Sequence, residues 1–477
     1  MVFSSYIFIF AFLPIVLCTY FALSKFKNPL YQRIFIIAAS LFFYGYYNVM
    51  YLLLIVASIL FNYILARGIQ QSENPNIRRL LLTVGVLFNV FLLGYFKYYD
   101  FFIENINSAF GTGFNLKNII LPLGISFFTF QQLSFIVSVY KREENVAKFL
   151  DYVLFVTFFP QLVAGPIVLY SEMIPQFMDE KRRYFNSENF SSGLYLFVMG
   201  VFKKAVIADT LAFFVDNGFG MSGVGLTAGW AISISYTLQL YFDFSGYSDM
   251  AVGLGKMFNI DIPFNFLSPY KSNSISEFWR RWHITLGRAL TTYIYIPLGG
   301  NRKGKARTCI NLFVTFFVSG LWHGAAWTFV LWGVLHGAFT MVERAIGEDH
   351  LKKIPNVLRV IATFLIVNAL WVLFRAEGFA QAIEIYRGMF AFNGIAFSQL
   401  ATVVGAEGGV NLPSILDYAY IVAMLGVLLY IVFGQKNSAY RLEKFTTSKK
   451  TAIATTLMFV ASLLCLSRES VFIYFNF

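Results

Sequence analysis

The chain has 477 residues, of which 58% are hydrophobic and 13% are charged. A soluble globular protein carries about 25% charged residues, so this composition excludes an ordinary soluble enzyme and places the chain in a lipid bilayer. The 37 Lys and Arg residues outnumber the 25 Asp and Glu residues, but they are spread over many loops. That distribution does not favour nucleic-acid binding, which gathers positive charge on one face.

Several apolar segments are long enough, or nearly so, to cross a bilayer core, which takes about 20 residues per helix. The first resembles a signal peptide but lacks a basic start and a small-residue cleavage site, so we interpret it as the first span. The pattern predicts roughly twelve spans, with residues 152–170 dipping into the membrane and returning. The clearest candidate spans are 6–23, 80–95, 357–374, 415–433 and 452–466.

Basic residues occur in every second loop between the apolar segments. By the positive-inside rule these loops are cytoplasmic and both ends of the chain lie outside. Without repeats or a soluble linker, the sequence predicts one integral membrane domain over 1–477, with helices in 1–150, a core in 151–345 and further helices in 346–477. The basic loops are 25–33, 67–79, 141–148, 181–183, 302–307, 352–359 and 436–450.

The three cysteines show no CxxC spacing, and no cluster of His or carboxylate residues has the spacing of a metal site. We therefore expect neither a disulfide framework nor a bound metal.

Four segments interrupt the apolar pattern, as polar groups do where a protein-lined cavity lies at membrane depth. In 121–132, Pro122 and Gly124 break the helix, and Gln131 and Gln132 bring amides inward. A charge at the bilayer centre costs on the order of 3 kcal/mol, so the charged segment 241–300 cannot face lipid and is predicted to be re-entrant. The other two interrupted segments are 159–167 and 319–327.

The segment 319–327 holds His323 between Trp322 and the small residues Gly324, Ala325 and Ala326. A lone histidine on an apolar helix is commonly a packing residue, and that interpretation stays open. Small neighbours that let backbones approach closely, together with the charged segment before them, put a functional role for this histidine on an equal footing with packing.

Four motifs in 241–327 closely resemble the membrane-bound O-acyltransferase family, in particular its bacterial alginate O-acetyltransferase branch. The likeness follows the chain in order from Val2 to the ending 472–477. The motifs are Asp-Phe-Ser-Gly-Tyr-Ser-Asp at 243–249, Glu-Phe-Trp-Arg-Arg-Trp-His at 277–283, Tyr-Ile-Pro-Leu-Gly-Gly-Asn at 295–301 and Leu-Trp-His-Gly-Ala-Ala-Trp at 321–327.

The resemblance implies an all-α, polytopic membrane protein in which tilted helices and re-entrant segments form a ring around a central funnel. It implies catalytic roles for His323 and His283. It also implies transfer of an acetyl group from a cytoplasmic thioester, acetyl-CoA or an acyl-carrier protein, across the bacterial inner membrane. The acceptor would be an extracytoplasmic polysaccharide such as alginate, reached through a separate extracytoplasmic acetyltransferase or relay protein. Within the family the acceptor stays open among alginate, cellulose, peptidoglycan, teichoic acid reached through a carrier, and a relay protein itself.

Acyl transfer to a hydroxyl needs a base, and a neutral imidazole suits that task, so His323 is the candidate base. His283 could position the acceptor, hold the acyl carbonyl or share the proton transfer. Arg280 and Arg281 could contact donor phosphates or could be cytoplasmic anchors. The other predicted substrate-binding residues are Trp282, Trp322, Asp243 and Gln131.

Four charged residues carry structural predictions. Asp243 and Asp249 are expected at a loop or helix end that fixes the funnel, rather than as metal ligands. Lys204 is expected, with its neighbour Lys203, to snorkel or to line the cytoplasmic mouth of the funnel.

Two rivals remain. A transporter or flippase would also have broken helices and polar residues at the midplane, but it predicts repeated halves, and we find none. A scaffold subunit would have histidines that only pack.

Overall fold

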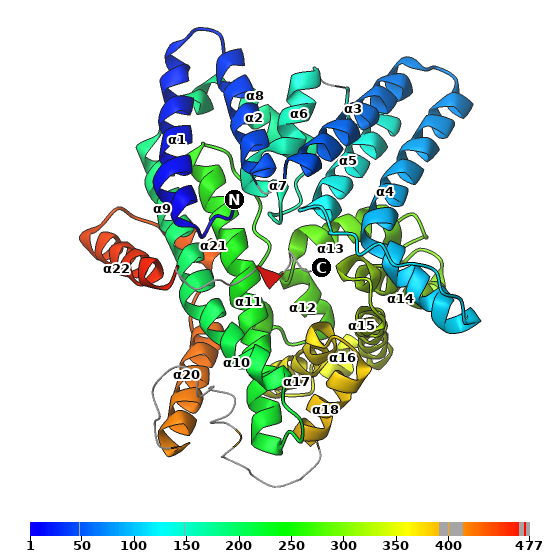
Figure 1. The fold of residues 1–477 in the computed structure, drawn as a ribbon, viewed down its shortest axis with the longest axis vertical. Helices are drawn as coiled ribbons and strands as arrows, with labels where there is room; N and C mark the ends of the chain where they lie inside the picture. The colour runs from blue at the N-terminus through cyan, green and yellow to red at the C-terminus, as the bar shows by residue number, and fades with distance from the viewer. Residues whose placement is uncertain (47, 147, 391–398, 400–413, 467–471, 474–477) are drawn as a thin grey trace. The chain divides into compact units, whose positions relative to one another are not determined.

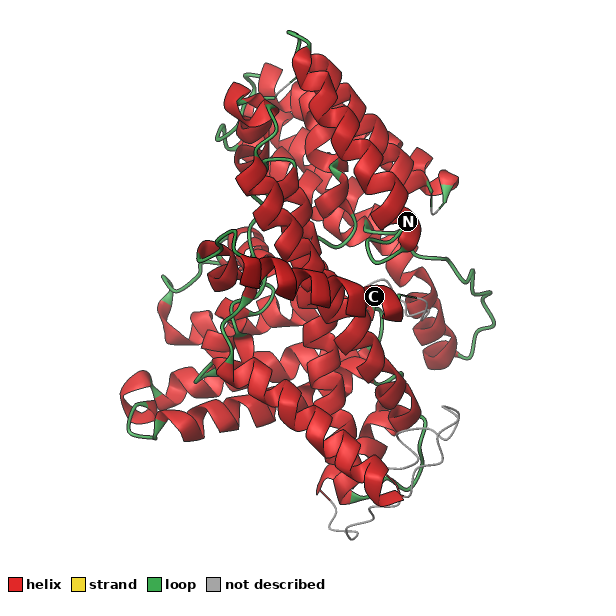
Figure 2. Ribbon diagram, turned by 90° about the vertical axis from the view of Figure 1, so that its left-hand side faces the viewer, coloured by secondary structure: helices red, strands yellow, loops and turns green. Residues whose placement is uncertain are grey.

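A computed structural model describes residues 1–46, 48–146, 148–390, 399, 414–466 and 472–473. Within these ranges the regular structure is helical, and no strand occurs (Figure 2). The last residues of the motif resemblance, 474–477, lie outside the described residues. The chain forms two compact units that alternate along the sequence, and the prediction of a single integral domain stays a prediction. Unit 1 comprises Met1–Val201, Tyr247–Pro263 and Thr446–Phe459, and unit 2 comprises Phe202–Gly246, Phe264–Phe445 and Val460–Phe477.

Unit 1 is built around α3, α4 and α5, which pack against one another (Figure 1). The side chain of Asn48 accepts a hydrogen bond from Met50 N at the start of α3, and Asn74 caps α4 in the same way before Pro75. The helices of this unit are η1 (Phe8–Phe12), α1 (Leu13–Ala22), η2 (Leu23–Lys25), α2 (Leu30–Gly45), α3 (Val49–Gln71), α4 (Pro75–Phe110), α5 (Ile125–Tyr140), α6 (Phe149–Thr157), α7 (Phe159–Leu162), α8 (Tyr170–Met178), η3 (Glu180–Arg183) and α9 (Ser187–Phe202).

A buried group of amides joins four helices of unit 1. We call Ser58, Asn62, Asn89, Gln132 and Tyr152 the Asn62 network. Asn62 Nδ2 donates to Gln132 Oε1 at 3.0 Å, and Asn89 Nδ2 donates to Asn62 Oδ1 at 2.6 Å. Gln132 Nε2 donates to Ser58 Oγ at 3.0 Å, and Tyr152 Oη donates to Gln132 Oε1 at 3.2 Å. Because lipid offers no partners, these mutual bonds let polar side chains lie inside an apolar bundle.

The two interrupted segments of unit 1 meet each other. Gly124, with φ of 70°, ends the break before α5, and a Cβ there would lie 2.8 Å from the carbonyl oxygen of Leu162. Gln131 Nε2 donates to Gln161 Oε1 at 2.7 Å. The predicted breaks at Pro122 and Gly124 and in 159–167 are confirmed, because α5 begins only at Ile125 and α7 ends at Leu162.

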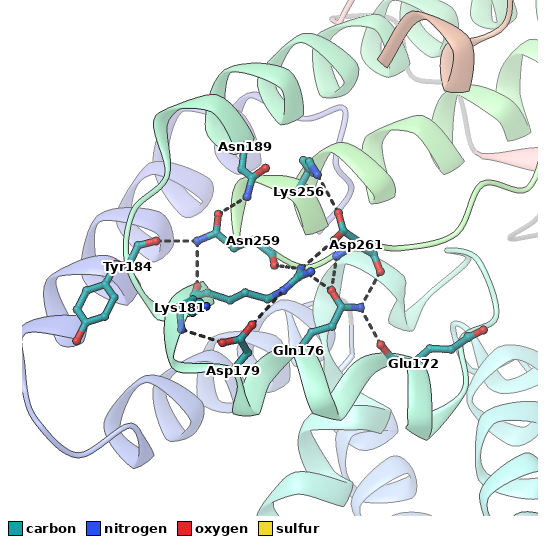
Figure 3. Close-up of polar contacts among 10 residues, drawn as sticks. Glu172, Gln176, Asp179, Lys181, Tyr184, Asn189, Lys256, Asn259 and Asp261 are labelled. Carbon is teal, nitrogen blue, oxygen red and sulfur yellow. Dashed lines mark hydrogen bonds and ion pairs between the residues drawn. The ribbon is translucent and has the colours of Figure 1, made fainter. Parts of the chain in front are cut away.

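A third polar group of unit 1, which we call the Asp261 cluster, holds the turn after α11 (Figure 3). Arg182 Nη1 lies 2.8 Å from Asp261 Oδ2, and Lys256 Nζ lies 2.9 Å from Asp261 Oδ1. Asn259, with φ of 63°, donates from Nδ2 to the carbonyls of Arg182 and Tyr184. Burial alone would raise the pKa of the Asp261 carboxyl, but Lys256 and Arg182 outweigh it and hold that pKa below its usual range.

Unit 2 contains the long helices α14, α15 and α17 and several short ones between them and α11. The predicted interruption in 241–300 starts only after α11, which continues unbroken to Met257. The helices of this unit are η4 (Lys203–Ala208), α10 (Asp209–Phe219), α11 (Leu226–Met257, in this unit as far as Gly246), η5 (Pro269–Lys271), α12 (Ile275–Arg281), α13 (Ile284–Leu290), η6 (Thr291–Tyr295), α14 (Gly304–His323), α15 (Trp327–Ile346), α16 (Glu348–Leu351), α17 (Asn356–Arg375), α18 (Phe379–Phe390), α20 (Ser414–Gly434) and α21 (Ser438–Glu443); α22 (Lys449–Cys465) joins the two units in sequence.

Five helices in the described part of the chain are long and apolar enough to cross a membrane, and three shorter apolar helices accompany them. The protein is therefore a multi-pass membrane protein. Of the five apolar segments named from the sequence, 6–23, 80–95 and 357–374 overlap candidate spans, and 415–433 overlaps a shorter apolar helix. The segment 452–466 overlaps α22, which is not among the candidate spans of the described residues. The number of about twelve spans and the re-entrant path of 152–170 stay predictions. The five candidate spans are Phe8–Lys25, Val49–Gln71, Pro75–Phe110, Trp327–Ile346 and Asn356–Arg375.

Candidate active site

His323 lies at the break between two tightly packed helices of unit 2. It is the last residue of α14, after which Gly324 and Ala326 are extended and α15 begins at Trp327. Gly320 and Gly333 lie back to back where the two helices pack. A Cβ on Gly320 would lie 2.4 Å from the carbonyl oxygen of Phe329, so only glycine allows this approach. The small residues of the motif thus place His323 at a fixed backbone position.

His283 lies at a second backbone break, between α12 and α13. It has φ of 45° and ψ of 52°, a left-handed conformation that costs a non-glycine residue about 1–2 kcal/mol. The buried Asn265 holds this turn, because its carbonyl accepts from Ile284 N at 3.1 Å and its Oδ1 accepts from Thr285 Oγ1 at 2.7 Å. Backbone strain of this kind concentrates at functional sites. Asn265 carried no signal in the sequence.

The two histidines share one aromatic neighbour, Trp322. The Trp322 ring centroid lies 5.0 Å from that of His323 and 5.8 Å from that of His283. Phe244 packs against His283 at 4.8 Å, while Phe374 packs edge-on against His323 at 5.1 Å. The structure therefore brings together the predicted residues His283, His323 and Trp322 in a buried aromatic setting, where 1% and 2% of the two histidines are exposed.

A third histidine, which the sequence did not single out, packs with the same aromatic side chains. We call this set the aromatic group; it comprises Phe244, Trp279, His283, Trp322, His323, Trp332, His336 and Phe374. His336 on α15 is fully buried, and its Nδ1 accepts a hydrogen bond from Trp279 Nε1 at 3.2 Å. Trp332 contacts both His336, at 4.9 Å between ring centroids, and His323, at 5.1 Å. The spacing of thirteen residues from His323 is not a helical repeat, so only the return of α15 along α14 brings the two near one indole.

The predicted residues Arg280, Arg281 and Trp282 lie at the end of α12 and directly after it, and each has different surroundings. Arg280 is exposed, and Arg281 forms an ion pair with Glu277 one turn earlier. Trp282 is buried against Phe266, with ring centroids 4.9 Å apart. A contact of either arginine with donor phosphates stays a prediction.

Asp243 is not at a loop or helix end, contrary to the sequence-based expectation. It lies inside α11, and its Oδ1 is 2.8 Å from Lys204 Nζ, while its Oδ2 accepts from Ile473 N at 2.9 Å. Lys204 Nζ is also 2.6 Å from Asp209 Oδ1. A buried cation therefore compensates the two carboxylates inside the protein.

The same ion pairs correct the first alternative for Lys204, because its side chain is 5% exposed and does not snorkel. A place at the cytoplasmic mouth of the funnel stays a prediction. It lies in η4, a π-helical segment, and π-helical turns are frequent at functional sites. Asp249, likewise expected at a loop or helix end, is buried inside the part of α11 that belongs to unit 1. Gln131 also belongs to unit 1, and its role as a substrate-binding residue stays a prediction.

Among the described residues, no three His, Cys, Asp or Glu side chains gather as a metal site requires. The chemistry available in the aromatic group is that of imidazoles and indole N–H groups, which can accept a proton and donate hydrogen bonds. These are the groups that acyl transfer by general-base catalysis requires.

Comparison with known proteins agrees with that chemistry. The model of the membrane-bound O-acyltransferase family matches residues 136–373, which include every one of the histidine and tryptophan residues described above. The chain is 41% identical over 514 residues to a peptidoglycan O-acetyltransferase of Helicobacter pylori, covering 100% of this chain and 98% of the relative.

Two further relatives extend the comparison. The chain is 39% identical to a protein of Pseudomonas putida named "Probable alginate O-acetylase AlgI", with 100% of both chains covered. It is 26% identical to a teichoic acid D-alanyltransferase of Bacillus subtilis, over 46% of this chain and 58% of the relative.

Proposed function

Since the chain belongs to the membrane-bound O-acyltransferase family and is an O-acetyltransferase by its relatives, we propose that it carries acetyl groups from a cytoplasmic thioester to an extracytoplasmic polysaccharide, with His323 as general base. The observation that carries this proposal is the pairing of His323 and His283 on one indole, Trp322, at two backbone breaks. A histidine that only packs in the core could lie in an unbroken helix, without the backbone breaks seen at His323 and His283.

The step balances as an ordinary acyl transfer. His323 takes the proton of the acceptor hydroxyl while its oxygen forms a bond to the thioester carbonyl carbon. The tetrahedral intermediate then expels the thiolate, which receives the proton from His323. The products are an oxygen ester and a free thiol, and the base returns to its starting form. A positioned base of this kind contributes about 10²–10⁴ in rate.

The sides of the membrane on which the donor and the acceptor lie follow from the topology proposed from the basic loops. Acetyl-CoA is made and kept in the cytoplasm, and a polymer hydroxyl outside is separated from it by about 30 Å of hydrocarbon. The acetyl group therefore has to pass through the bundle, along the family's central funnel, in the bacterial inner membrane. We further propose that a separate extracytoplasmic protein completes the transfer to the polymer.

The relatives named for peptidoglycan and for alginate support a glycan as the acceptor. Peptidoglycan and alginate both offer sugar hydroxyls, so one mechanism serves either. The acetate released by mild base from each purified glycan would show which polymer this chain modifies.

The test of the mechanism is the His323→Ala variant in cells, with glycan acetylation normalised to the amount of protein in the membrane fraction. We expect acetylation to fall by about 10²-fold or more, to near background. His350→Ala is the matched control, because His350 is exposed on α16 and the same substitution there should leave acetylation unchanged. Retained acetylation in a well-expressed His323→Ala variant would contradict the mechanism and favour the transporter or scaffold interpretation.

A further inference from the structure

Two buried N–H groups lie one turn apart on α15 without an acceptor among the described residues. They are Nε1 of Trp332 and Nε2 of His336, and both side chains are fully buried. The proton on His336 follows from its other nitrogen. Because Nδ1 accepts from Trp279 Nε1, a neutral imidazole carries its proton on Nε2. Both atoms are therefore donors.

One of the two residues, Trp332, lies beside the candidate base, and His336 packs against Trp332 with ring centroids 4.9 Å apart. Residues four apart on a helix share one face, and the Trp332 ring stands at 89° to the His323 ring with 5.1 Å between centroids. Leaving a buried donor without a partner costs about 1–3 kcal/mol. Two such groups on one face in a natural protein call for an explanation.

We propose that Trp332 Nε1–H and His336 Nε2–H bind the carbonyl oxygen of the thioester and stabilise the oxyanion that forms during transfer. This rests on the proposed function, with His323 as base. When the acceptor oxygen attacks the carbonyl carbon, the C=O electron pair moves onto the oxygen between the two donors. When the thiolate leaves, the pair returns and the double bond forms again. One such donor typically contributes about 10²–10³ in rate.

A merely structural role for His336, as the acceptor for Trp279, predicts a different pattern of variants. In His336→Asn the amide oxygen takes the place of Nδ1, so the bond from Trp279 is kept but the distal N–H is lost. In His336→Gln the amide nitrogen reaches the place of Nε2, so a distal N–H is kept. The pair therefore separates the donor from the acceptor function of the imidazole.

The experiment measures transfer of label from radiolabelled acetyl-CoA to the endogenous acceptor in membrane vesicles that contain the full chain. We expect Trp332→Phe and His336→Asn each to lower the maximum rate by about 10–100-fold. The apparent KM for acetyl-CoA should change by less than about threefold, because the oxyanion exists only in the transition state. His336→Gln should recover at least about tenfold of the loss.

Trp327→Phe is the matched control, because Trp327 is 54% exposed at the start of the same helix. If His336→Asn works as well as or better than His336→Gln, His336 serves only Trp279 and the proposal is overturned. A raised KM with an unchanged maximum rate would overturn it too. If Trp332→Phe fails to accumulate, the two His336 variants decide.

The outcomes also separate this inference from the proposed function. If His323→Ala abolishes transfer while Trp332→Phe and His336→Asn keep the wild-type rate, only the oxyanion assignment fails. If His323→Ala keeps the wild-type rate, the proposed function fails, and this inference fails with it.

Discussion

The Asn62 network of unit 1 and the aromatic group of unit 2 differ in how completely their buried polar side chains are paired. In the Asn62 network, the amide groups of Asn62, Asn89 and Gln132 all find partners within the network or the adjacent backbone. In the aromatic group of unit 2, Trp332 and His336 keep donors that no described residue accepts. The fully paired Asn62 network is therefore expected to stabilise the fold, whereas the unpaired N–H groups of Trp332 and His336 are expected to bind a ligand. Substitutions can test this difference.

After His323, the largest effect on acetylation is expected at His283, where the contribution of the side chain and that of the backbone can be separated. His283→Ala and His283→Gly both remove the imidazole, so both should lower acetylation by about 10–100-fold, as the loss of an orienting contact does. Glycine also relieves the left-handed strain, so His283→Gly should be more stable than His283→Ala by about 1 kcal/mol. Acetylation in cells and the Tm in detergent measure the two effects. Equal stability of the two variants would show that the conformation is not strained.

In the Asn62 network a substitution is expected to lower stability and to leave activity unchanged. Asn62→Leu leaves Asn89 and Gln132 short of partners, which should destabilise the protein by about 1–3 kcal/mol. A lower Tm in detergent should therefore accompany an unchanged acetylation rate per folded molecule. Asn76→Leu makes the same change at an exposed position and should leave the Tm in place. A reduced acetylation rate at normal protein abundance would place Asn62 in the active site and contradict the distinction between the Asn62 network and the aromatic group.

The smallest effect is expected in the Asp261 cluster, which is half-exposed and screened by water. Asp261→Asn should lower the Tm only slightly at pH 7, because exposed ion pairs contribute about 0–1 kcal/mol. Since the folded-state pKa of Asp261 is lowered, its contribution is present above the unfolded value of about 3.9 and is lost as the pH falls through the folded value. The Tm difference from wild type should therefore close below about pH 4. A difference that grows toward low pH would contradict the assignment.

The sequence predicted the two catalytic candidates and the interruptions in 121–132 and 319–327 because these features are local. His283 and His323 lie in contiguous motifs, and Gly124 takes a left-handed conformation at its own position. The backbone break at His283 was not predicted. His336 and Asn265 were missed because their meaning depends on side chains far away in the chain. Asp243 was placed wrongly for the same reason, since the cost of a buried charge was judged without its counter-ion, Lys204.

The contact between Gly320 and Gly333 also constrains how the protein can move. With the backbones of α14 and α15 this close, sliding or separating them would open a void that no side chain can fill. We therefore expect the two helices to travel as one rigid body throughout a transfer cycle. Access to His323 would then come from rotation of neighbouring rings such as Phe374, which is a change of rotamer on a fast timescale rather than a slow parting of helices.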